Sequence, residues 1–148
     1  MMTAATRSNI ERAEAAATPD LVAAYQRDGA VCLRQLLNAD ELDQLRRGID
    51  ANLAAPSPRA IVASQADDPG FFIEDFCNWQ HNPDYRAVAC TSPLAQVAAR
   101  LMQSASVRLY HDHMLTKEPG TRQKTPWHQD QPYYNVDGVQ NVSFWSPM

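Results

Sequence analysis

Residues 108–134 read RLYHDHMLTKEPGTRQKTPWHQDQPYY and include most of the longest strand candidate of the chain. We predict that strand over residues 106–117, followed by a turn-rich polar loop over residues 119–126. A short extended piece is expected over residues 127–131. An Asp-Gly turn then leads into a last predicted strand, residues 139–145. The predicted strands therefore gather toward the C-terminal end of the chain.

The N-terminal half is predicted to be mainly helical. Capping residues followed by helix-forming sequence open four segments, at Thr18, Asn38, Asn82 and Ser92. Pro follows three of these caps, in the first helical position, where its missing N–H costs nothing. Apolar alternation predicts one strand, residues 30–36, between the first two of these helices.

The order of the elements predicts an α+β fold, in which N-terminal helices precede a β-sandwich or jelly roll (a double-stranded β-helix). A jelly roll has eight strands, and the sequence offers at most about five, so we expect it to be incomplete in this chain. Residues 1–17, rich in Ala and Thr, are predicted to be a flexible leader with some helix. Residues 18–148 are predicted to be the N-terminal part of a single domain.

Composition excludes several classes of protein. A net charge of −4 at pH 7 argues against a nucleic-acid partner, which would favour a basic surface. No stretch approaches the roughly 18 apolar residues needed for a membrane span, and the N-terminus has no apolar core of a secretory signal. We therefore expect a cytoplasmic protein that binds a small molecule, without a nucleic-acid or membrane partner. The oligomeric state does not follow from the sequence.

His128-Gln129-Asp130 is the sharpest chemical feature of the sequence. On an extended segment, residues i and i+2 project to one face, so an imidazole nitrogen and a carboxylate oxygen could meet at one ion. This pair supplies two members of the 2-His-1-carboxylate triad that binds Fe(II). The pattern alone is weak, because a surface His beside a turn Asp gives the same letters.

His111-Asp112-His113 is the rival metal candidate. Two His at i and i+2 of a strand also face the same way. If Met114 points into the barrel, alternation places both of these His on the opposite face and Asp112 inward. We therefore interpret His111 and His113 as structural or surface residues, with a metal role as the alternative.

The stretch quoted above, followed by NVSFW at residues 141–145, resembles the phytanoyl-CoA dioxygenase family. Upstream, YQRDGAVCLRQLLNADELDQLR at residues 25–46 resembles the opening helix, strand and helix of that family. The similarity covers the chain from about residue 20 to its end, and PWHQDQPYY at residues 126–134 matches the central element.

The resemblance implies a jelly-roll hydroxylase that uses Fe(II), O₂ and 2-oxoglutarate, with His128 and Asp130 as iron ligands. It also implies contacts with 2-oxoglutarate from Met114 and Trp145, for which ordinary core packing is the alternative. The Met side chain would offer an apolar wall, and the Trp could stack over the co-substrate. Three basic residues near the loop could attract an anion, although solvated loop charges are the simpler interpretation. They are Lys117, Arg122 and Lys124.

Two features that the family implies are missing, namely the distal His ligand and a basic partner for the 2-oxoglutarate carboxylate. No His follows His128, and the chain ends at Met148. We therefore expect a fragment of a larger oxygenase that is inactive alone. The alternative is a non-catalytic jelly-roll module that binds a metal or ligand. A halogenase would be expected to replace the carboxylate with Gly or Ala, so Asp130 argues against that activity.

Overall fold

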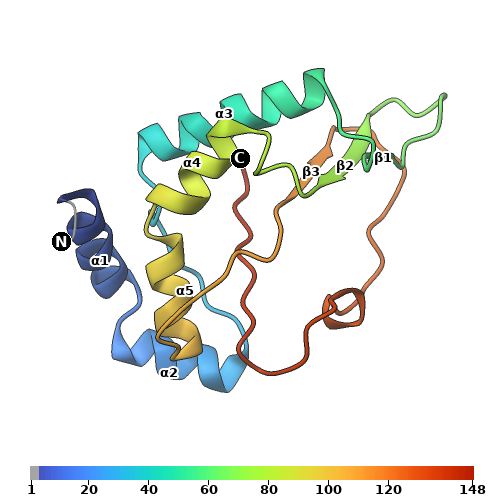
Figure 1. Cartoon of the computed structure of the whole chain (residues 1–148). Helices are drawn as coiled ribbons and strands as arrows, with labels where there is room; N and C mark the ends of the chain where they lie inside the picture. Colours follow the sequence, from blue (N-terminus) through green and yellow to red (C-terminus); the bar gives the residue numbers. More distant parts are fainter. Residues whose placement is uncertain (1–3) are drawn as a thin grey trace.

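Five α-helices and a three-stranded sheet make up the computed structural model of the protein, which describes residues 4–148 and the side chains from residue 7 onward (Figure 1). The helices are α1 (Ala4–Ala16), α2 (Pro19–Asp28), α3 (Ala39–Ala54), α4 (Pro83–Thr91) and α5 (Leu94–Met102). The strands are β1 (Ile61–Val62), β2 (Phe72–Phe76) and β3 (His113–Lys117), and a 3₁₀ helix, η1, covers Gln131–Tyr133. The α+β class is confirmed, whereas three strands do not make a jelly roll.

Three of the four predicted helix starts are confirmed by capping contacts, and the start of α5 has no side-chain cap. The Thr18 hydroxyl accepts a hydrogen bond from the backbone of Leu21 at 3.4 Å, and Asn38 forms a reciprocal capping box with Glu41. The Asn82 side chain caps α4, and α5 begins two residues after Ser92. Such caps satisfy the free N–H groups of a first helical turn. Within residues 4–148, no helix combines the length and the apolar character that a membrane crossing requires.

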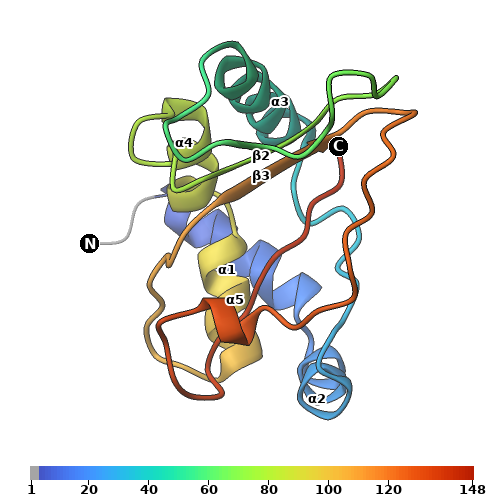
Figure 2. The same cartoon turned by 90° about the vertical axis from the view of Figure 1, so that its right-hand side faces the viewer.

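The sheet is antiparallel, in the order β1-β2-β3, and its register assigns its residues to two faces. Asp75 lies opposite Met114, so these two side chains share one face with Ile73. Ile73 and Met114 form a buried cluster with Tyr85 of α4, and apolar side chains of α3 pack against it. Figure 2 shows β2 and β3 running alongside these two helices. This face of the sheet packs against α3 and α4, and we call it the helix face.

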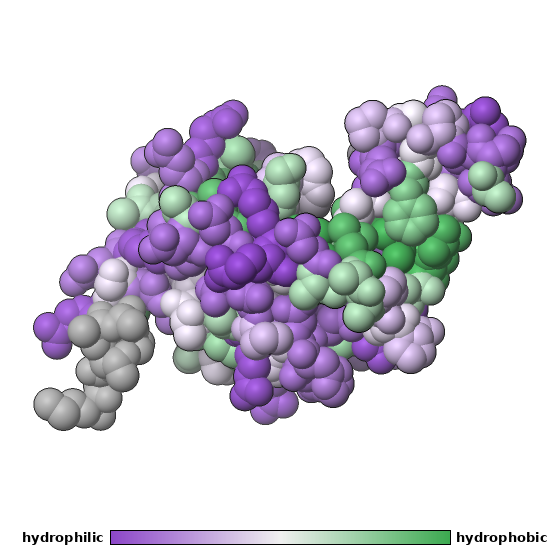
Figure 3. All heavy atoms as spheres, turned by 90° about the horizontal axis from the view of Figure 1, so that it is seen from above, coloured by the Kyte–Doolittle hydropathy of each residue, from purple (hydrophilic) through white to green (hydrophobic). Residues whose placement is uncertain are grey.

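The other face of the sheet is open. His113 stacks on Phe76 at 4.2 Å between ring centroids, and Lys117 lies over the Phe72 ring. Leu115 and Ile61 are 47% and 52% exposed. In Figure 3 apolar residues gather on the side of the molecule where the sheet lies. The sheet thus carries apolar surface on the face that the helices leave uncovered.

A second core joins α1, α2 and α5. Ala13 and Ala17 are fully buried against Val97 and Leu101 of α5. Partly buried side chains from α2, the following segment and the C-terminal segment complete this core. They are Val22, Tyr25, Val31, Leu33, Leu36 and Val142.

Two predicted strands are wrong, and a third is shorter than predicted. Residues 30–36 and 139–145 adopt no strand, although Val31, Leu33 and Val142 pack against the second core. Alternation therefore predicted which side chains are buried, but a strand also needs a neighbouring backbone to bond with. The predicted strand 106–117 is reduced to β3, which matches the five residues of its partner β2.

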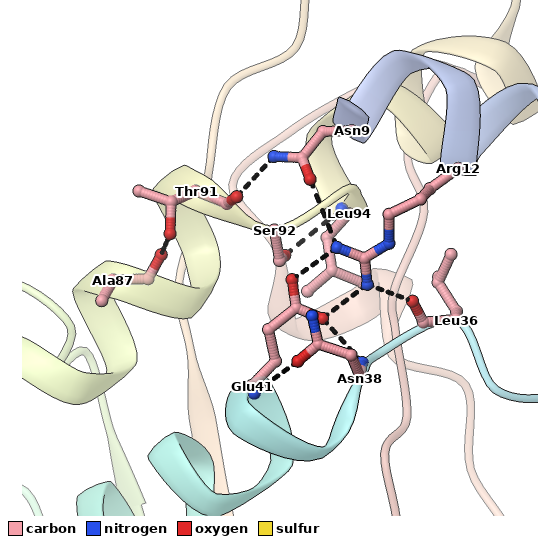
Figure 4. Close-up of polar contacts among 9 residues, drawn as sticks. All are labelled: Asn9, Arg12, Leu36, Asn38, Glu41, Ala87, Thr91, Ser92 and Leu94. Atoms are coloured by element: carbon pink, nitrogen blue, oxygen red, sulfur yellow. Dashed lines mark hydrogen bonds and ion pairs between the residues drawn. The ribbon is translucent and has the colours of Figure 1, made fainter. Parts of the chain in front are cut away.

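The predicted flexible leader is a packed helix over its described part. Arg12 of α1 binds Glu41 of α3 through two hydrogen bonds of 2.8 and 2.6 Å and donates to the Leu36 carbonyl at 2.7 Å (Figure 4). Asn9 donates to the Thr91 carbonyl at the end of α4. Residues 1–3 of the predicted leader lie outside the described part. The Arg12–Glu41 contact lowers the pKa of Glu41 against the opposing effect of burial and raises that of Arg12.

Replacing Arg12 with Ala should lower the free energy of unfolding by about 1.5 kcal/mol, because hydrogen bonds to a charged partner are lost from a partly buried pair. The measurement is urea denaturation, with hydrogen exchange of α1 as a local readout. Arg46→Ala is the matched control, since Arg46 pairs with Asp43 on the exposed surface, where a pair contributes about 0.5 kcal/mol or less. Equal losses from the two substitutions would contradict this role of Arg12.

A buried polar network holds the helix face of the sheet to α3. Asp75, fully buried, accepts hydrogen bonds from the Asn52 amide at 2.8 Å and from the backbone and hydroxyl of Ser57 at 2.7 and 2.6 Å. Asn52 in turn accepts from Asn78 and from the Tyr85 hydroxyl, both at 3.3 Å. Burial alone would raise the pKa of Asp75, but the donors Ser57, Asn78 and Asn52 outweigh it and hold that pKa well below its usual range.

Candidate metal-binding pair

His128 and Asp130 lie side by side in the loop region after β3. The His128 Nε2 atom is 3.2 Å from the Asp130 Oδ1 atom, and both side chains are about half exposed, at 41% and 55%. The predicted convergence of an imidazole nitrogen and a carboxylate oxygen is therefore observed.

The local backbone that produces this convergence differs from the prediction. Asp130 has helical dihedral angles, φ −74° and ψ −31°, and stands at the N-terminus of η1. The segment 127–131 is therefore not an extended piece whose alternation aligns the two side chains. Instead, the chain turns at Asp130, and the Tyr133 N–H donates to the Asp130 carbonyl at 2.9 Å. The turn folds the carboxylate back toward the imidazole.

A hydrogen bond at one imidazole nitrogen orients the His128 ring. His128 Nδ1 lies 2.8 Å from the carbonyl oxygen of Pro126. A carbonyl only accepts, so Nδ1 carries a proton and donates it, which leaves Nε2 as the nitrogen that could bind a metal ion. Nε2 lies 3.2 Å from Asp130 Oδ1, so either a metal ion or a proton on Nε2 would join the two groups. A second group that orients the ring in this way is common for His ligands of metals.

The spacing of the two atoms fits ligands of one metal ion. Bonds of about 2.1 Å from nitrogen and oxygen to a first-row ion, meeting at a right angle, place the two donor atoms about 3.0 Å apart. The separation between His128 and Asp130 is close to this value. The residues present thus fit two ligand positions. Within residues 4–148, no group of three or more His, Cys, Asp and Glu side chains gathers around an ion-sized site.

The two residues expected to contact 2-oxoglutarate lie in different surroundings. Met114 is 6% exposed, belongs to the core cluster on the helix face of the sheet, and accepts a hydrogen bond from the Thr116 hydroxyl at its sulfur. These contacts agree with ordinary core packing, which was the alternative interpretation of Met114. Trp145 is 87% exposed. The structure does not bring Met114 and Trp145 together, and their contact with 2-oxoglutarate stays a prediction.

The rings of the rival candidate, His111 and His113, have separate neighbours. His113 is on the open face of the sheet, where it pairs with Glu74 at 3.2 Å. His111 lies edge-on to Tyr110 and Tyr134 instead. Between them, Asp112 accepts hydrogen bonds from two backbone N–H groups after β2. Residues 111–113 therefore make separate structural contacts. Among the described residues they do not form a shared three-ligand site.

Two of the basic residues near the loop have partners that hold the loop in place. Lys117 donates to the Thr125 hydroxyl at 3.5 Å, and Arg122 pairs with Asp67 at 3.2 Å. Arg122 also lies 3.7 Å from Asp68. Lys124 is exposed. These contacts favour a structural role for Lys117 and Arg122 in the loop that leads to His128.

One neighbour of the pair was missed by sequence reasoning. The Tyr134 hydroxyl donates to Oδ2 of Asp130 at 3.3 Å. Tyr134 follows Asp130 by four residues, and the sequence predicted no role for it. Had the turn at η1 been predicted, the spacing of four residues would have placed the Tyr134 phenol one helical turn beyond the Asp130 carboxylate and indicated this contact.

Comparison with known proteins identifies the family of this chain. The family model described as Phytanoyl-CoA dioxygenase (PhyH) matches residues 25–148, which include α3 and everything after it. Neither a search of curated proteins nor a search of solved structures found a match. The matched segment contains both members of the His128–Asp130 pair and spans more than half of the chain. The chain therefore belongs to the phytanoyl-CoA dioxygenase family, whose members are in general Fe(II)- and 2-oxoglutarate-dependent oxygenases.

Proposed function

We propose that this protein is a Fe(II)- and 2-oxoglutarate-dependent dioxygenase that hydroxylates a small organic substrate. The observation that carries the proposal is the approach of His128 Nε2 to Asp130 Oδ1, with the other imidazole nitrogen bonded to the Pro126 carbonyl. Because the chain belongs to this family, we expect 2-oxoglutarate and O₂ to be its co-substrates. Bound Fe(II) would supply the activation of O₂, which no amino-acid side chain can perform.

The residues of this chain would hold and orient the ion. His128 offers a neutral nitrogen and Asp130 an anionic oxygen, a combination found in the facial triad with a second His as the third ligand. The Pro126 carbonyl would orient the imidazole for metal binding by accepting a hydrogen bond from Nδ1. We further propose that the three-stranded sheet is part of a jelly roll.

The loop before the pair limits where the two ligands can lie. It is tied to the sheet and to the β1–β2 connection at three points. Lys117 contacts Thr125, Arg122 pairs with Asp67, and the Glu118 carboxylate accepts from the Phe71 N–H at 2.9 Å. A loop held at both sides keeps reacting groups in one geometry, which is how a protein scaffold contributes to such chemistry.

Binding of 2-oxoglutarate to the iron-loaded protein tests the proposal. Without O₂, addition of 2-oxoglutarate to the Fe(II)-loaded chain should produce the visible absorption band of an iron-chelated 2-oxo acid. Succinate, which lacks the 2-oxo group, is the matched control ligand and should produce no band. Asp130→Ala should remove the band, whereas Gln129→Ala should keep it, because Gln129 contributes no ligand in the proposed pair.

Two results would count against the proposed function. The first is the absence of any band at saturating 2-oxoglutarate with iron bound. The second is equal loss from Asp130→Ala and Gln129→Ala, which would show that the carboxylate is not the ligand.

A further inference from the structure

We propose that Tyr134 is a positioning residue for the Asp130 carboxylate, and that Tyr110 fixes Tyr134 in place. This inference rests on the proposed function, because it concerns how one ligand of the pair is held. The two oxygens of Asp130 have different neighbours. Oδ2 accepts the Tyr134 hydroxyl at 3.3 Å, and Oδ1 lies 3.2 Å from His128 Nε2.

The hydrogen bond from Tyr134 matters because the Asp130 carboxylate is otherwise free to rotate. The Asp130 side chain is 55% exposed, so packing does little to restrict it. An ionised carboxylate accepts from a phenol through either oxygen. With Oδ2 engaged by Tyr134, the lone pairs of Oδ1 are directed to the side where His128 lies. The carboxylate would then offer Oδ1 to a bound ion, while Oδ2 stays with Tyr134.

The position of Tyr134 follows from the turn at η1. The Tyr134 N–H donates to the Gln131 carbonyl at 3.1 Å, which closes the turn and returns the side chain to Asp130. Tyr134 is half-buried, in contrast to Tyr133, which is 76% exposed. The partial burial shows that the Tyr134 ring packs on other residues.

Those residues come from the segment just before β3. The Tyr134 ring lies edge-on to Tyr110 at 5.4 Å and to His111 at 5.6 Å, and the two latter rings contact each other at 5.1 Å. Edge-to-face arrangements of this kind are the favoured geometry of aromatic pairs. The Asn135 N–H also donates to the Tyr110 hydroxyl at 3.1 Å. Ring contacts and a hydrogen bond thus join two segments more than 20 residues apart.

Removing the single hydroxyl tests the inference. Tyr134→Phe keeps the ring and its aromatic contacts and loses only the bond to Asp130. Its Fe(II) affinity, measured by anaerobic titration, should be about tenfold weaker, the lower end of the range for groups that orient a ligand. Tyr25→Phe is the matched control, because the Tyr25 hydroxyl donates over the same 3.3 Å to the Asn141 carbonyl, away from the pair. Tyr25→Phe should leave the affinity unchanged.

Two further readouts separate positioning from a general structural effect. With Co(II) in place of Fe(II), Tyr134→Phe should change the visible spectrum of the bound ion, and Tyr25→Phe should not. In an Asp130→Ala background, Tyr134→Phe should cause no additional loss of affinity, because its effect passes through the missing carboxylate.

The outcomes distinguish the inference from the proposed function. If His128→Ala weakens binding strongly but Tyr134→Phe does not, the inference is wrong and the metal pair stands. An unchanged Co(II) spectrum, or an equal loss with and without Asp130, would also overturn the inference. If the unsubstituted protein binds neither Fe(II) nor Co(II), the proposed function fails, and this inference fails with it.

Discussion

Replacing Asp75 with Asn is expected to lower the free energy of unfolding by about 3 kcal/mol. The substitution removes the charge toward which Asn52 and both donors of Ser57 point. It also places an NH₂ donor among groups that already donate, so at least one buried donor loses its acceptor. Thermal or urea unfolding measures the loss, and a fall in Tm of about 10 °C is expected for a chain of this length.

The matched control is Asp50→Asn, on the exposed side of the same helix that supplies Asn52. This change should alter the free energy of unfolding by about 0.5 kcal/mol or less, as is usual for surface positions. If Asp50→Asn and Asp75→Asn have equal effects, the buried network does not stabilise the fold as described.

The pH dependence of stability gives an independent readout of the same carboxylate. The pKa of Asp75 is lower in the folded chain than the value of about 3.9 expected in the unfolded chain. A depressed folded-state pKa stabilises the fold at every pH above the unfolded value. That contribution is lost as the pH falls below about 4 toward the folded-state pKa. Asp75→Asn should therefore unfold with a shallower dependence on pH in this acid range than the unsubstituted protein.

The parts of the fold that the sequence predicted are those decided by neighbouring residues. Thr18, Asn38 and Asn82 cap their helices because each side chain reaches an N–H group two or three residues ahead. Residues 30–36 alternate in polarity as a strand would, and Val31 and Leu33 do pack on a core. A strand requires a partner backbone as well, and sequence periodicity carries no information about that partner.

The Asp75 network had no signature in the sequence. Asp75 stands inside an aromatic segment, and its donors Asn52 and Ser57 lie 23 and 18 positions away, so only the folded chain brings them to it. The packing of α1 depends in the same way on Arg12 meeting Glu41, 29 positions away. Long-range polar contacts of this kind escape reasoning from local patterns.

The proximity of His128 and Asp130 was predicted correctly, the extended backbone between them was predicted wrongly, and their role as metal ligands stays a prediction. The spacing of His128 and Asp130 limits their separation in any conformation, so their proximity follows from the sequence. The turn at Asp130 depends on the 3₁₀ helix that follows, where Pro132 takes an early helical position. Because the turn was not predicted, the contact between Tyr134 and Asp130 was not predicted either.

His128→Ala is expected to weaken the binding of Fe(II) by at least about 100-fold, because it removes a ligand rather than a group that orients one. The remaining Asp130 carboxylate would hold the ion by a single contact from the pair. Anaerobic titration with Fe(II) measures the affinity. The loss should exceed that of Tyr134→Phe by about tenfold, which places the two residues in the expected order of importance.

His113→Ala is the matched control for this substitution, since it removes an imidazole that also lies about 3.2 Å from a carboxylate, that of Glu74. His113 sits on β3 and stacks on Phe76, so its ring nitrogen is engaged in a contact within the sheet. Its loss should leave Fe(II) affinity within about threefold of the unsubstituted protein, well below the effect of removing a group that orients a ligand. A large loss from His113→Ala with little change from His128→Ala would move the metal site to the open face of the sheet. The contact with Pro126 argues for His128, because a backbone acceptor at Nδ1 orients the ring so that Nε2 is directed to a carboxylate.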